Sequence, residues 1–313
     1  MIMKTTIFSG TKSRVFPLML VFALMIFILS CSHLGTLSQI GAAVGQATGV
    51  ISADTAAAIA RTGEAWGRAF EDITPEQEYF IGRAVAANIL GSYRIQTSNS
   101  ALTIYVNKIC NTLVINSPRP EIFNGYRVNI LDTDEINAFA TSGGHIFVTR
   151  GLVNCAGSED ALAAVIAHEI AHIQLQHGLK SIKNSRITQA LIVTGTSAAS
   201  AAGGYDLGEL TSVFSESVGE IITTMVNNGY SQAQEFEADS VAMELLALAG
   251  YEPSSLLEML RVLGQNQSSR SGGFNRTHPT PAQRISNVQR TVANFRVADT
   301  RSYRVPRFNE INY

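Results

Sequence analysis

The 313-residue sequence predicts a mainly helical α+β fold in which a small β-sheet lies beside one long, buried helix. Two stretches before residue 95 have the apolar periodicity of helices, at 53–70 and 75–90, and a third, more apolar stretch surrounds residues 160–175. Two short segments, at 126–131 and 145–149, instead have the alternation and turn signals of strands. Because these strands immediately precede the most apolar helix, we expect an edge of their sheet to lie beside it.

The first thirty residues predict export through a bacterial membrane. A basic start precedes an apolar run, Val15 to Leu29, that is short for a membrane-spanning helix but suits a signal peptide. The run ends in Ile28-Leu29-Ser30-Cys31, which resembles a bacterial lipobox, so we expect residues 1–30 to be removed and Cys31 to be lipidated. The predicted location is the bacterial cell envelope, lipid-anchored and facing the periplasm, with Ser32 favouring the outer membrane. An uncleaved membrane anchor is the alternative.

The remaining chain is predicted to form one domain between two less structured segments. Residues 31–52 are rich in Gly, Ala and Ser and are expected to form a lipidated tether. Residues 53–295 are long enough to bury a single core, and 296–313 form a C-terminal tail. Thr74 and Gln77 match a capping box at the start of the second helix. The net charge is −2 and basic residues are not clustered, which argues against nucleic acid as a partner.

The predicted sheet offers a platform for an extended peptide. Tyr126–Leu131 reads as a strand and Asp132–Asp134 as a turn, and Ile136–Ala140 leads through a glycine pair to a second strand, His145–Thr149. An edge strand here would bind an extended chain by backbone pairing, largely independent of its sequence. The candidate substrate-binding residues on this platform are Gly143, Gly144, His145, Ile146 and Phe147. For His145, a packing or surface role is the simpler alternative.

The strongest chemical motif is His168-Glu169-Ile170-Ala171-His172, which lies inside the most apolar helix. Ser158 is a suitable N-cap for this helix. Histidines four residues apart lie about 40° from each other around a helix, so both imidazoles face one point, with Glu169 one step round. This pattern is typical of zinc hydrolases, in which the glutamate acts as general base. A chance match is the alternative, but buried polar groups of this kind are costly unless a metal or one another satisfies them.

A third protein ligand would complete such a zinc site. Metzincins need Gly at 175 and His at 178, whereas this chain has Leu175 and Gly178, so that class is excluded. His177 lies about 140° round the helix from His172, and we interpret it as a capping or surface histidine.

A second helix offers acidic candidates for the third ligand. Glu235 and Asp239 are four residues apart at the start of a strongly helical run that ends at Gly250. One carboxylate from this helix is expected to bind zinc, while Asp239 accepts a hydrogen bond from a ligand imidazole and so sets its orientation. A solvated acidic helix face is the alternative.

The order of these motifs resembles the gluzincin metallopeptidase family that includes HtpX and the CAAX prenyl proteases. The likeness is greatest to its periplasmic lipoprotein-type members BepA, LoiP and YcaL, and no tetratricopeptide extension is expected here. The chain departs from the family at Ser142, where proline is usual, and at Gln232, where arginine often stands. The matching segments are Thr74–Glu78 with Ile81-Gly82, Asn137–Ala140, Gly143-Gly144, Gly151-Leu152, His168–His172, Glu235–Asp239, Ala249–Tyr251 with Pro253, and Thr277–Pro279 with Arg284.

The resemblance implies a zincin-type metallopeptidase domain that binds one Zn²⁺ per chain. It implies that Glu235, not Glu237, is the third ligand beside His168 and His172, with Asp239 as its companion. It also implies that Asn137 contacts the substrate backbone.

His278 follows a Gln-, Asn-, Ser- and Gly-rich stretch, Gly264 to Arg276, that is typical of a mobile loop. The resemblance implies that His278 can occupy the open zinc position and hold the enzyme latent. Two other roles are open: stabilisation of the developing oxyanion, and a simple His-Pro turn.

Signal peptide and resemblance together imply a zinc-dependent endopeptidase that hydrolyses unfolded or misassembled envelope proteins. The alternative is a chaperone-like lipoprotein or assembly factor that binds envelope proteins with a latent zinc site. Residues 181–229 are either small-residue helices or a lid over the site. Cys110 and Cys155 either form a disulfide or stay as buried free thiols.

Overall fold

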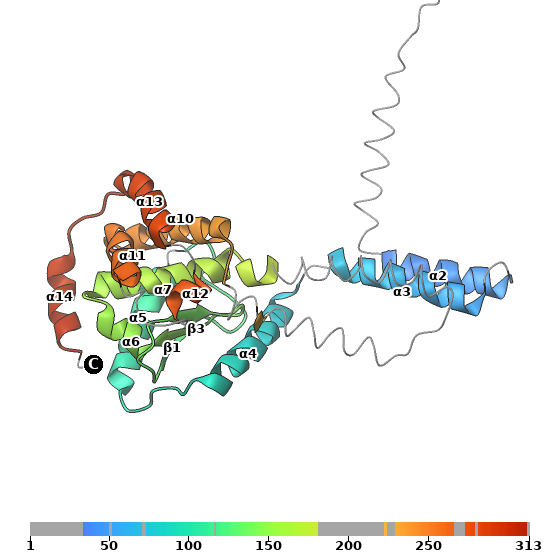
Figure 1. Ribbon diagram of the computed structural model, residues 1–313, viewed down its shortest axis with the longest axis horizontal. Coiled ribbons are helices and arrows are strands. Elements are labelled where there is room, and N and C mark those ends of the chain that lie inside the picture. The colour runs from blue at the N-terminus through green and yellow to red at the C-terminus, as the bar shows by residue number, and fades with distance from the viewer. Residues whose placement is uncertain are drawn as a thin grey trace, which may run out of the picture. The chain divides into compact units, whose positions relative to one another are not determined.

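The computed structural model describes residues 34–49, 52–70, 73–115, 117–180, 222–223, 229–265, 273–278 and 281–311. The predicted signal peptide, Cys31 and almost all of the predicted lid lie outside these residues. The chain divides into two compact units. In one of them, helices α2 (Leu34–Ala47) and α3 (Ala53–Phe70) pack along each other, and the elements from Ile73 onward belong to the other (Figure 1).

Helix α2 occupies most of the segment in which the sequence predicted a tether. The Gly- and Ala-rich composition that is typical of a linker also suits a close-packed helix, because alanine is the best helix former and small side chains let helices approach. Ala42 and Ala56 are accordingly buried. Helix α3 has the predicted bounds but belongs to the unit of α2, so the larger unit begins at Ile73 rather than at residue 53.

The larger unit is mainly helical and contains one small sheet, which confirms the predicted α+β fold class. Figure 1 shows helix α7 in its middle, between the strands and α10. The elements in chain order are α4 (Pro75–Ser92), α5 (Ser100–Val114), β1 (Arg127–Leu131), β2 (Ala138–Ala140), β3 (His145–Thr149), α6 (Arg150–Cys155), α7 (Glu159–Gln174), α10 (Gln232–Leu248), α11 (Ser254–Gln265), α12 (Phe274–Thr277), α13 (Pro281–Thr291), a 3₁₀ turn (Val292–Asn294) and α14 (Arg301–Asn309).

Both predicted strands form, as β1 and β3, and Ala138–Ala140 adds a third strand, β2, that was not predicted; the strand order differs from the expected platform. Strand β3 lies in the centre, parallel to β1 and antiparallel to β2. Its residues His145, Ile146 and Phe147 are paired in register with β1, and the last two also with β2, so they cannot take a substrate strand by backbone pairing. The edge strand that packs against α7 is β2. Alternation along a strand reports which face is buried and does not report which strands are its neighbours.

The glycine pair before β3 is required by the turn. Gly143 and Gly144 have φ values of 83° and 92°, a region that side-chain-bearing residues rarely adopt. A Cβ atom on Gly143 would lie 2.7 Å from the Cα atom of Tyr79, and one on Gly144 would lie 2.3 Å from the carbonyl oxygen of Gly125. The pair therefore has a structural reason to be glycine, and its contact with substrate stays a prediction.

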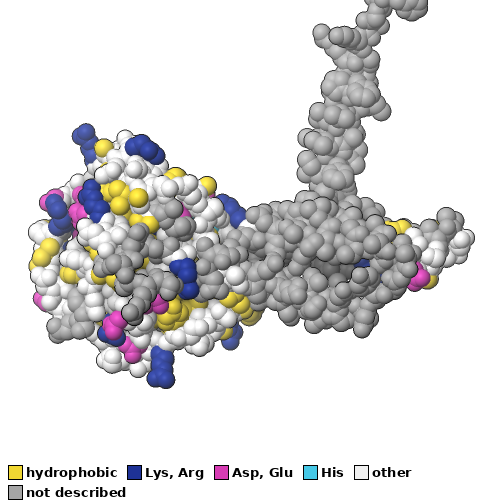
Figure 2. Space-filling model, viewed as in Figure 1, with side chains coloured by type: hydrophobic (Ala, Val, Ile, Leu, Met, Phe, Trp, Pro, Cys, Tyr) yellow, Lys and Arg dark blue, Asp and Glu magenta, His cyan; other side chains and the backbone are white. Residues whose placement is uncertain are grey.

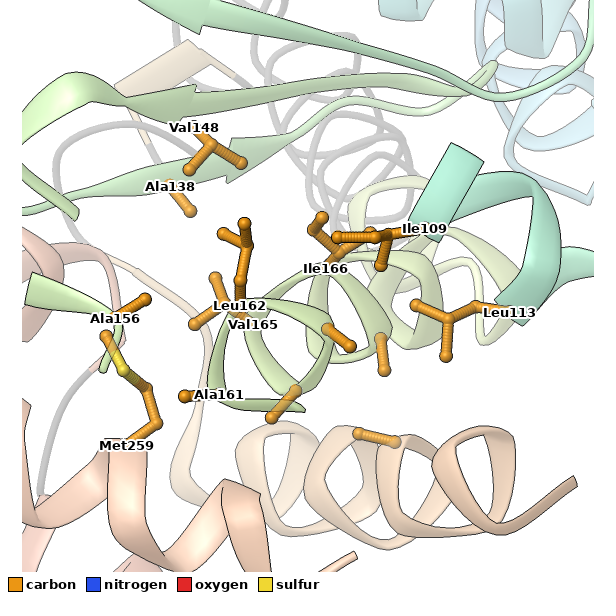
Figure 3. Close-up of a cluster of buried hydrophobic side chains, with 14 of the residues drawn as sticks. Ile109, Leu113, Ala138, Val148, Ala156, Ala161, Leu162, Val165, Ile166 and Met259 are labelled. Atoms are coloured by element: carbon orange, nitrogen blue, oxygen red, sulfur yellow. The ribbon is translucent and has the colours of Figure 1, made fainter. Parts of the chain in front are cut away.

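Helix α7 is the centre of the core because it is apolar on nearly all sides. Each fully buried Leu, Ile or Val contributes roughly 1.5–3 kcal/mol, so this packing holds α7, and any side chain on it, firmly in place. Figure 3 shows side chains of α7 against α5, the sheet and α11; its labelled residues on these elements are Ala161, Leu162, Val165, Ile166, Ile109, Leu113, Ala138, Val148 and Met259.

The first turn of α7 is fixed by its own N-cap and by the C-terminal helix of the chain. The side chain of Ser158 accepts a hydrogen bond from the backbone N–H of Ala161, which confirms the predicted N-cap of α7. The predicted C-terminal tail contains helix α14, whose buried Arg304 donates two 2.9 Å hydrogen bonds to Asp160 in the first turn of α7. The sequence pattern could not show this pairing because the two residues are 144 positions apart.

In the described part of the chain, basic side chains on the visible face are dispersed and the two cysteine thiols are unreactive. On the face shown in Figure 2, Lys and Arg side chains are dispersed over the larger unit. Cys110 and Cys155 are free thiols, and burial raises the pKa of Cys110 to about 12 and that of Cys155 to about 11, so neither is a reactive thiolate near neutral pH. Among the described residues, no helix has the length and apolar character needed to cross a membrane.

Gly82 tests the contact between α4 and the turn before β3. A Cβ atom at Gly82 would lie 1.2 Å from the backbone oxygen of Ser142, so Gly82→Ala must displace the turn. We expect a loss of about 1–3 kcal/mol in the free energy of unfolding, measured by urea denaturation. Gly91→Ala on the same helix is the control, because no atom lies within 4 Å and alanine favours the helix by up to about 1 kcal/mol. Equal stability of Gly82→Ala and wild type would contradict the close contact.

Candidate metal centre

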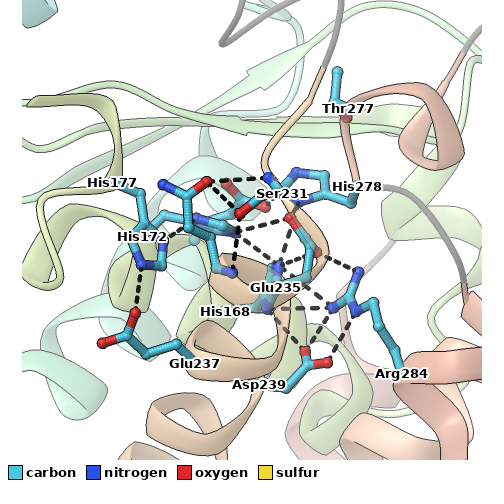
Figure 4. A network of polar contacts seen from close by, with 12 residues as sticks. His168, His172, His177, Ser231, Glu235, Glu237, Asp239, Thr277, His278 and Arg284 are labelled. Carbon is cyan, nitrogen blue, oxygen red and sulfur yellow. Dashed lines mark hydrogen bonds and ion pairs between the residues drawn. The ribbon is translucent and has the colours of Figure 1, made fainter. Parts of the chain in front are cut away.

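Four buried side chains converge between α7 and α10, as Figure 4 shows. His168 and His172 come from α7, Glu235 from α10 and His278 from the end of α12, and one ligand atom of each lies within 4.8 Å of the others. The Nε2 atoms of His168 and His172 are 3.1 Å apart, and they lie 3.4 and 3.5 Å from the two carboxylate oxygens of Glu235. The convergence of the two histidines with Glu235 agrees with the prediction from their spacing and from the resemblance.

Glu169 is fully buried beside these four groups. Neither of its carboxylate oxygens has a hydrogen-bond partner among the described residues, and the Nε2 atom of His278 lies 3.4 Å from Oε1. Burial raises the pKa of Glu169, and the neighbouring positive charges of His278 and His168 only partly oppose this rise. A carboxylate with a raised pKa and unused lone pairs is suited to accept a proton.

The donor set of this cluster fits zinc. Two imidazoles and one carboxylate on two rigid helices are the ligands of a catalytic zinc site, which keeps one position open for reactants. The unpaired oxygens of Glu169 are a further sign, because buried carboxylate oxygens without a partner are costly and occur mainly at functional sites. His278 supplies a fourth donor atom, its third nitrogen, at the same point.

Asp239 and Arg284 contact the ligands His168 and Glu235. The Oδ1 atom of Asp239 lies 3.1 Å from Nδ1 of His168, which is the position predicted for it. Fully buried Arg284 donates to both oxygens of Asp239, at 2.6 and 2.9 Å, and its Nη1 lies 2.9 Å from Glu235. Burial tends to raise the pKa of Asp239, but Arg284 and His168 outweigh burial and lower it to about 2. Arg284 entered the sequence analysis only as a matching residue, without a role.

The two ligand histidines are in different electrostatic environments. Burial acts to lower the pKa of both imidazoles. For His168, the hydrogen bonds to Asp239 and Glu235 outweigh burial and the charge of Arg284, and its pKa rises to about 9. His172 has no carboxylate at its Nδ1 atom, and its pKa is held well below the usual range.

The segment that carries His278 is anchored to the start of β2. The backbone N–H of Phe274 donates to the carbonyl of Ile136, and the hydroxyl of Thr277 donates to Oδ1 of Asn137. The Phe274 ring stacks on His278 with centroids 4.3 Å apart. The last residues of the predicted loop thus form α12, and buried Asn137 is engaged with this segment. Its predicted contact with substrate stays a prediction.

His177 is the residue that the sequence interpretation placed incorrectly. It is completely buried, and its Nδ1 atom lies 2.8 Å from Nδ1 of His172. The estimate of 140° assumed a continuous helix, but α7 ends at Gln174 and Gln176 has a left-handed φ of 55°. This reversal folds the chain back, so His177 lies against the ligand five residues before it. No signal in the sequence marks Gln176 as left-handed.

The comparison with protein families agrees with this geometry. The family model described as "Peptidase family M48" matches residues 101–292, which include α7, α10 and every residue of the cluster. The chain belongs to peptidase family M48. The resemblance drawn from the motifs is therefore confirmed, and the M48 site of this chain is that of a zinc metallopeptidase.

Three relatives illustrate the range of the family. Over 197 residues the M48 chain is 29% identical to the metalloprotease LoiP of Escherichia coli, covering 62% of this chain and 72% of LoiP. It is 24% identical to the mitochondrial metalloendopeptidase OMA1 of Schizosaccharomyces pombe, covering 71% of this chain and 63% of OMA1. It is 26% identical to the beta-barrel assembly-enhancing protease of E. coli, covering 68% of this chain and 43% of that protein. The chain thus spans less than two thirds of the last two.

Asp239→Asn tests the buried ion pair behind the M48 ligands. Removing one charge leaves Arg284 partly uncompensated, so we expect metal-free protein at pH 7 to lose about 3–5 kcal/mol in urea denaturation. The pKa of Asp239 is lowered from 3.8 to about 2, so its stabilisation is complete above pH 4 and is lost as the pH falls through 2. The stability difference between wild type and Asp239→Asn should therefore shrink by about 2 kcal/mol from pH 5 to pH 2. A difference independent of pH would contradict the pairing.

Proposed function

We propose that this protein is a zinc-dependent endopeptidase of the bacterial cell envelope that cleaves unfolded or misassembled envelope proteins. The observation that carries the proposal is buried Glu169, with both oxygens unpaired, beside the ligand cluster of an M48 site. The lipobox-like segment ending at Cys31 supports the envelope location, with lipid attached to Cys31 and the domain facing the periplasm; Ser32, directly after that cysteine, favours the outer membrane. The relative named a beta-barrel assembly-enhancing protease supports an envelope substrate.

The chemistry proposed is hydrolysis of a peptide bond. His168, His172 and Glu235 would hold the zinc ion, which would supply a Lewis acid for the scissile carbonyl and for the attacking water. Glu169 takes the proton of that water and passes it to the leaving amine, a task suited to a buried carboxylate with a raised pKa. Asp239 holds the His168 ring in place.

We place the substrate along β2, the edge strand beside α7. An extended peptide that pairs with this strand would run past the ligand cluster, and backbone pairing accepts many sequences, as removal of diverse unfolded proteins requires. Asn137, at the start of β2, is in a position to contact that peptide once Thr277 releases it.

His278 is proposed to hold the enzyme latent. In the structure its ring lies among the ligands, 3.0 Å from Glu235 and 3.4 Å from Glu169, and is 2% exposed. The same segment is bonded to the start of β2 through Phe274 and Thr277. One movement of this segment would therefore uncover both the proposed substrate strand and the open zinc position.

The second candidate function is a chaperone-like lipoprotein or assembly factor with a latent zinc site. The burial of His278 among the ligands favours this candidate, because a site closed in this way can persist in a protein that only binds its clients. The intact Glu169 favours the peptidase, because a binding protein has no use for a general base.

Glu169→Gln separates catalysis from metal binding. We expect the variant to keep one zinc per chain and to lose at least 10³-fold of its casein cleavage, since the ligands remain and the proton acceptor is gone, on the order of the loss typical for a general base. Glu235→Ala should lose the metal as well. Glu244→Gln, exposed on the same helix α10, is the matched control and should resemble wild type. Turnover by metal-pure Glu169→Gln would remove Glu169 from the mechanism.

His278→Ala tests the latent state. If His278 blocks the open position, the variant should cleave casein several-fold faster than wild type at equal zinc content. The measurement is the initial rate of cleavage with zinc quantified in both proteins. A rate below wild type would instead assign His278 to stabilisation of the charge that develops on the carbonyl oxygen.

A further inference from the structure

The two ligand histidines differ in the partner of their outer nitrogen, Nδ1, which faces away from the ligand cluster. A histidine binds a metal through a nitrogen lone pair, and the partner of the other nitrogen decides which tautomer is present. The Nδ1 atom of His168 faces the carboxylate of Asp239, an acceptor, which places the proton on Nδ1 and the lone pair on Nε2. The Nδ1 atom of His172 faces another imidazole, Nδ1 of His177, at 2.8 Å. One of these two nitrogens must donate and the other accept.

Glu237 decides which nitrogen donates. Its Oε2 atom lies 3.2 Å from Nε2 of His177, and a carboxylate only accepts hydrogen bonds, so Nε2 of His177 carries a hydrogen. A neutral imidazole with hydrogen on Nε2 has a lone pair on Nδ1. His177 therefore accepts a hydrogen bond from Nδ1–H of His172. This leaves the lone pair of His172 on Nε2, the atom that lies 3.1 Å from Nε2 of His168 inside the ligand cluster.

We propose that His177 and Glu237 are a positioning pair that fixes the tautomer and ring orientation of the zinc ligand His172. The pair does for His172 what Asp239 does for His168. It rests on the zinc site of the proposed function and adds two residues that the motif did not assign. Both work through His172 and touch neither zinc nor substrate.

The surrounding structure restrains the same ring. Tyr230 stacks on His172 with centroids 4.0 Å apart and planes 16° apart, so the ring is held from its face as well as at its edge. The left-handed backbone at Gln176 brings His177 under the ligand. Lys180, whose Nζ lies 3.8 Å from Oε2 of Glu237, places a positive charge beside the carboxylate. The ring stacking restrains the His172 imidazole directly. The Gln176 backbone and the Lys180 charge hold His177 and Glu237 beside it.

Zinc affinity is the direct measurement, because it does not depend on turnover. The full-length chain is titrated with zinc in competition with a chelator, in wild type and in His177→Phe, His177→Asn and Glu237→Ala. The Phe side chain fills the site without an acceptor, so we expect affinity to fall on the order of 10–100-fold, and Glu237→Ala to fall in the same direction. His177→Asn offers its Oδ1 atom as an acceptor and should restore most of the loss. Glu244→Ala, exposed on α10, is the matched control and should bind as wild type does.

The double variant His177→Phe/Glu237→Ala distinguishes a chain of hydrogen bonds from two separate packing effects. If Glu237 acts through His177, the double variant should bind zinc no more weakly than His177→Phe alone. Full additivity, or wild-type affinity in folded His177→Phe or in Glu237→Ala, would overturn the proposal. Should His177→Phe fail to fold, Glu237→Ala decides, because that side chain is half-exposed. If the wild type fails to cleave casein while the zinc affinities follow the expected pattern, only the proposed function is refuted.

Discussion

The structure depends on one constraint, the neutralisation of charged groups buried between α7, α10 and α13. Arg284 is completely buried and pairs with two carboxylates, those of Asp239 and Glu235. A buried charge without a partner is strongly destabilising, so these ion pairs favour the relative position of the three helices that keeps them together. That position is the one in which Glu235 meets the two histidines of α7. The ion pairs thus set the geometry of the metal site, while the apolar core supplies the stability.

Each nitrogen and oxygen around the site has a defined partner except those that chemistry requires. The outer nitrogens of His168 and His172 are engaged by Asp239 and His177, which leaves their inner nitrogens for the metal. Among the described residues, neither oxygen of Glu169 has a hydrogen-bond partner, and the Nε2 atom of His278 lies 3.4 Å from Oε1. A rigid set of ligands beside an unpaired carboxylate is the arrangement that a hydrolytic site needs.

A chain segment that belongs to neither α7 nor α10 covers the site. Residues 273–278 contact the residues just before β2 through Phe274 and Thr277, and they insert His278 among the ligands. Under the proposed function, substrate pairing with β2 would therefore be coupled to the opening of the site. Such coupling would favour extended chains, since only an extended chain competes for a strand edge.

Local patterns were enough to predict α3, α4, α7 and α10, the strands β1 and β3, the caps at Thr74 and Ser158 and the shared face of His168 and His172, because each depends on neighbours within one or two turns. Glu235 as third ligand needed the family resemblance as well. Only the tertiary structure decided that β3 is central, that Arg284 pairs with both Asp239 and Glu235 and that His177 is buried against His172. Strand order and charge pairing join residues far apart in sequence, and the left-handed Gln176 is a single backbone angle that no side-chain pattern encodes.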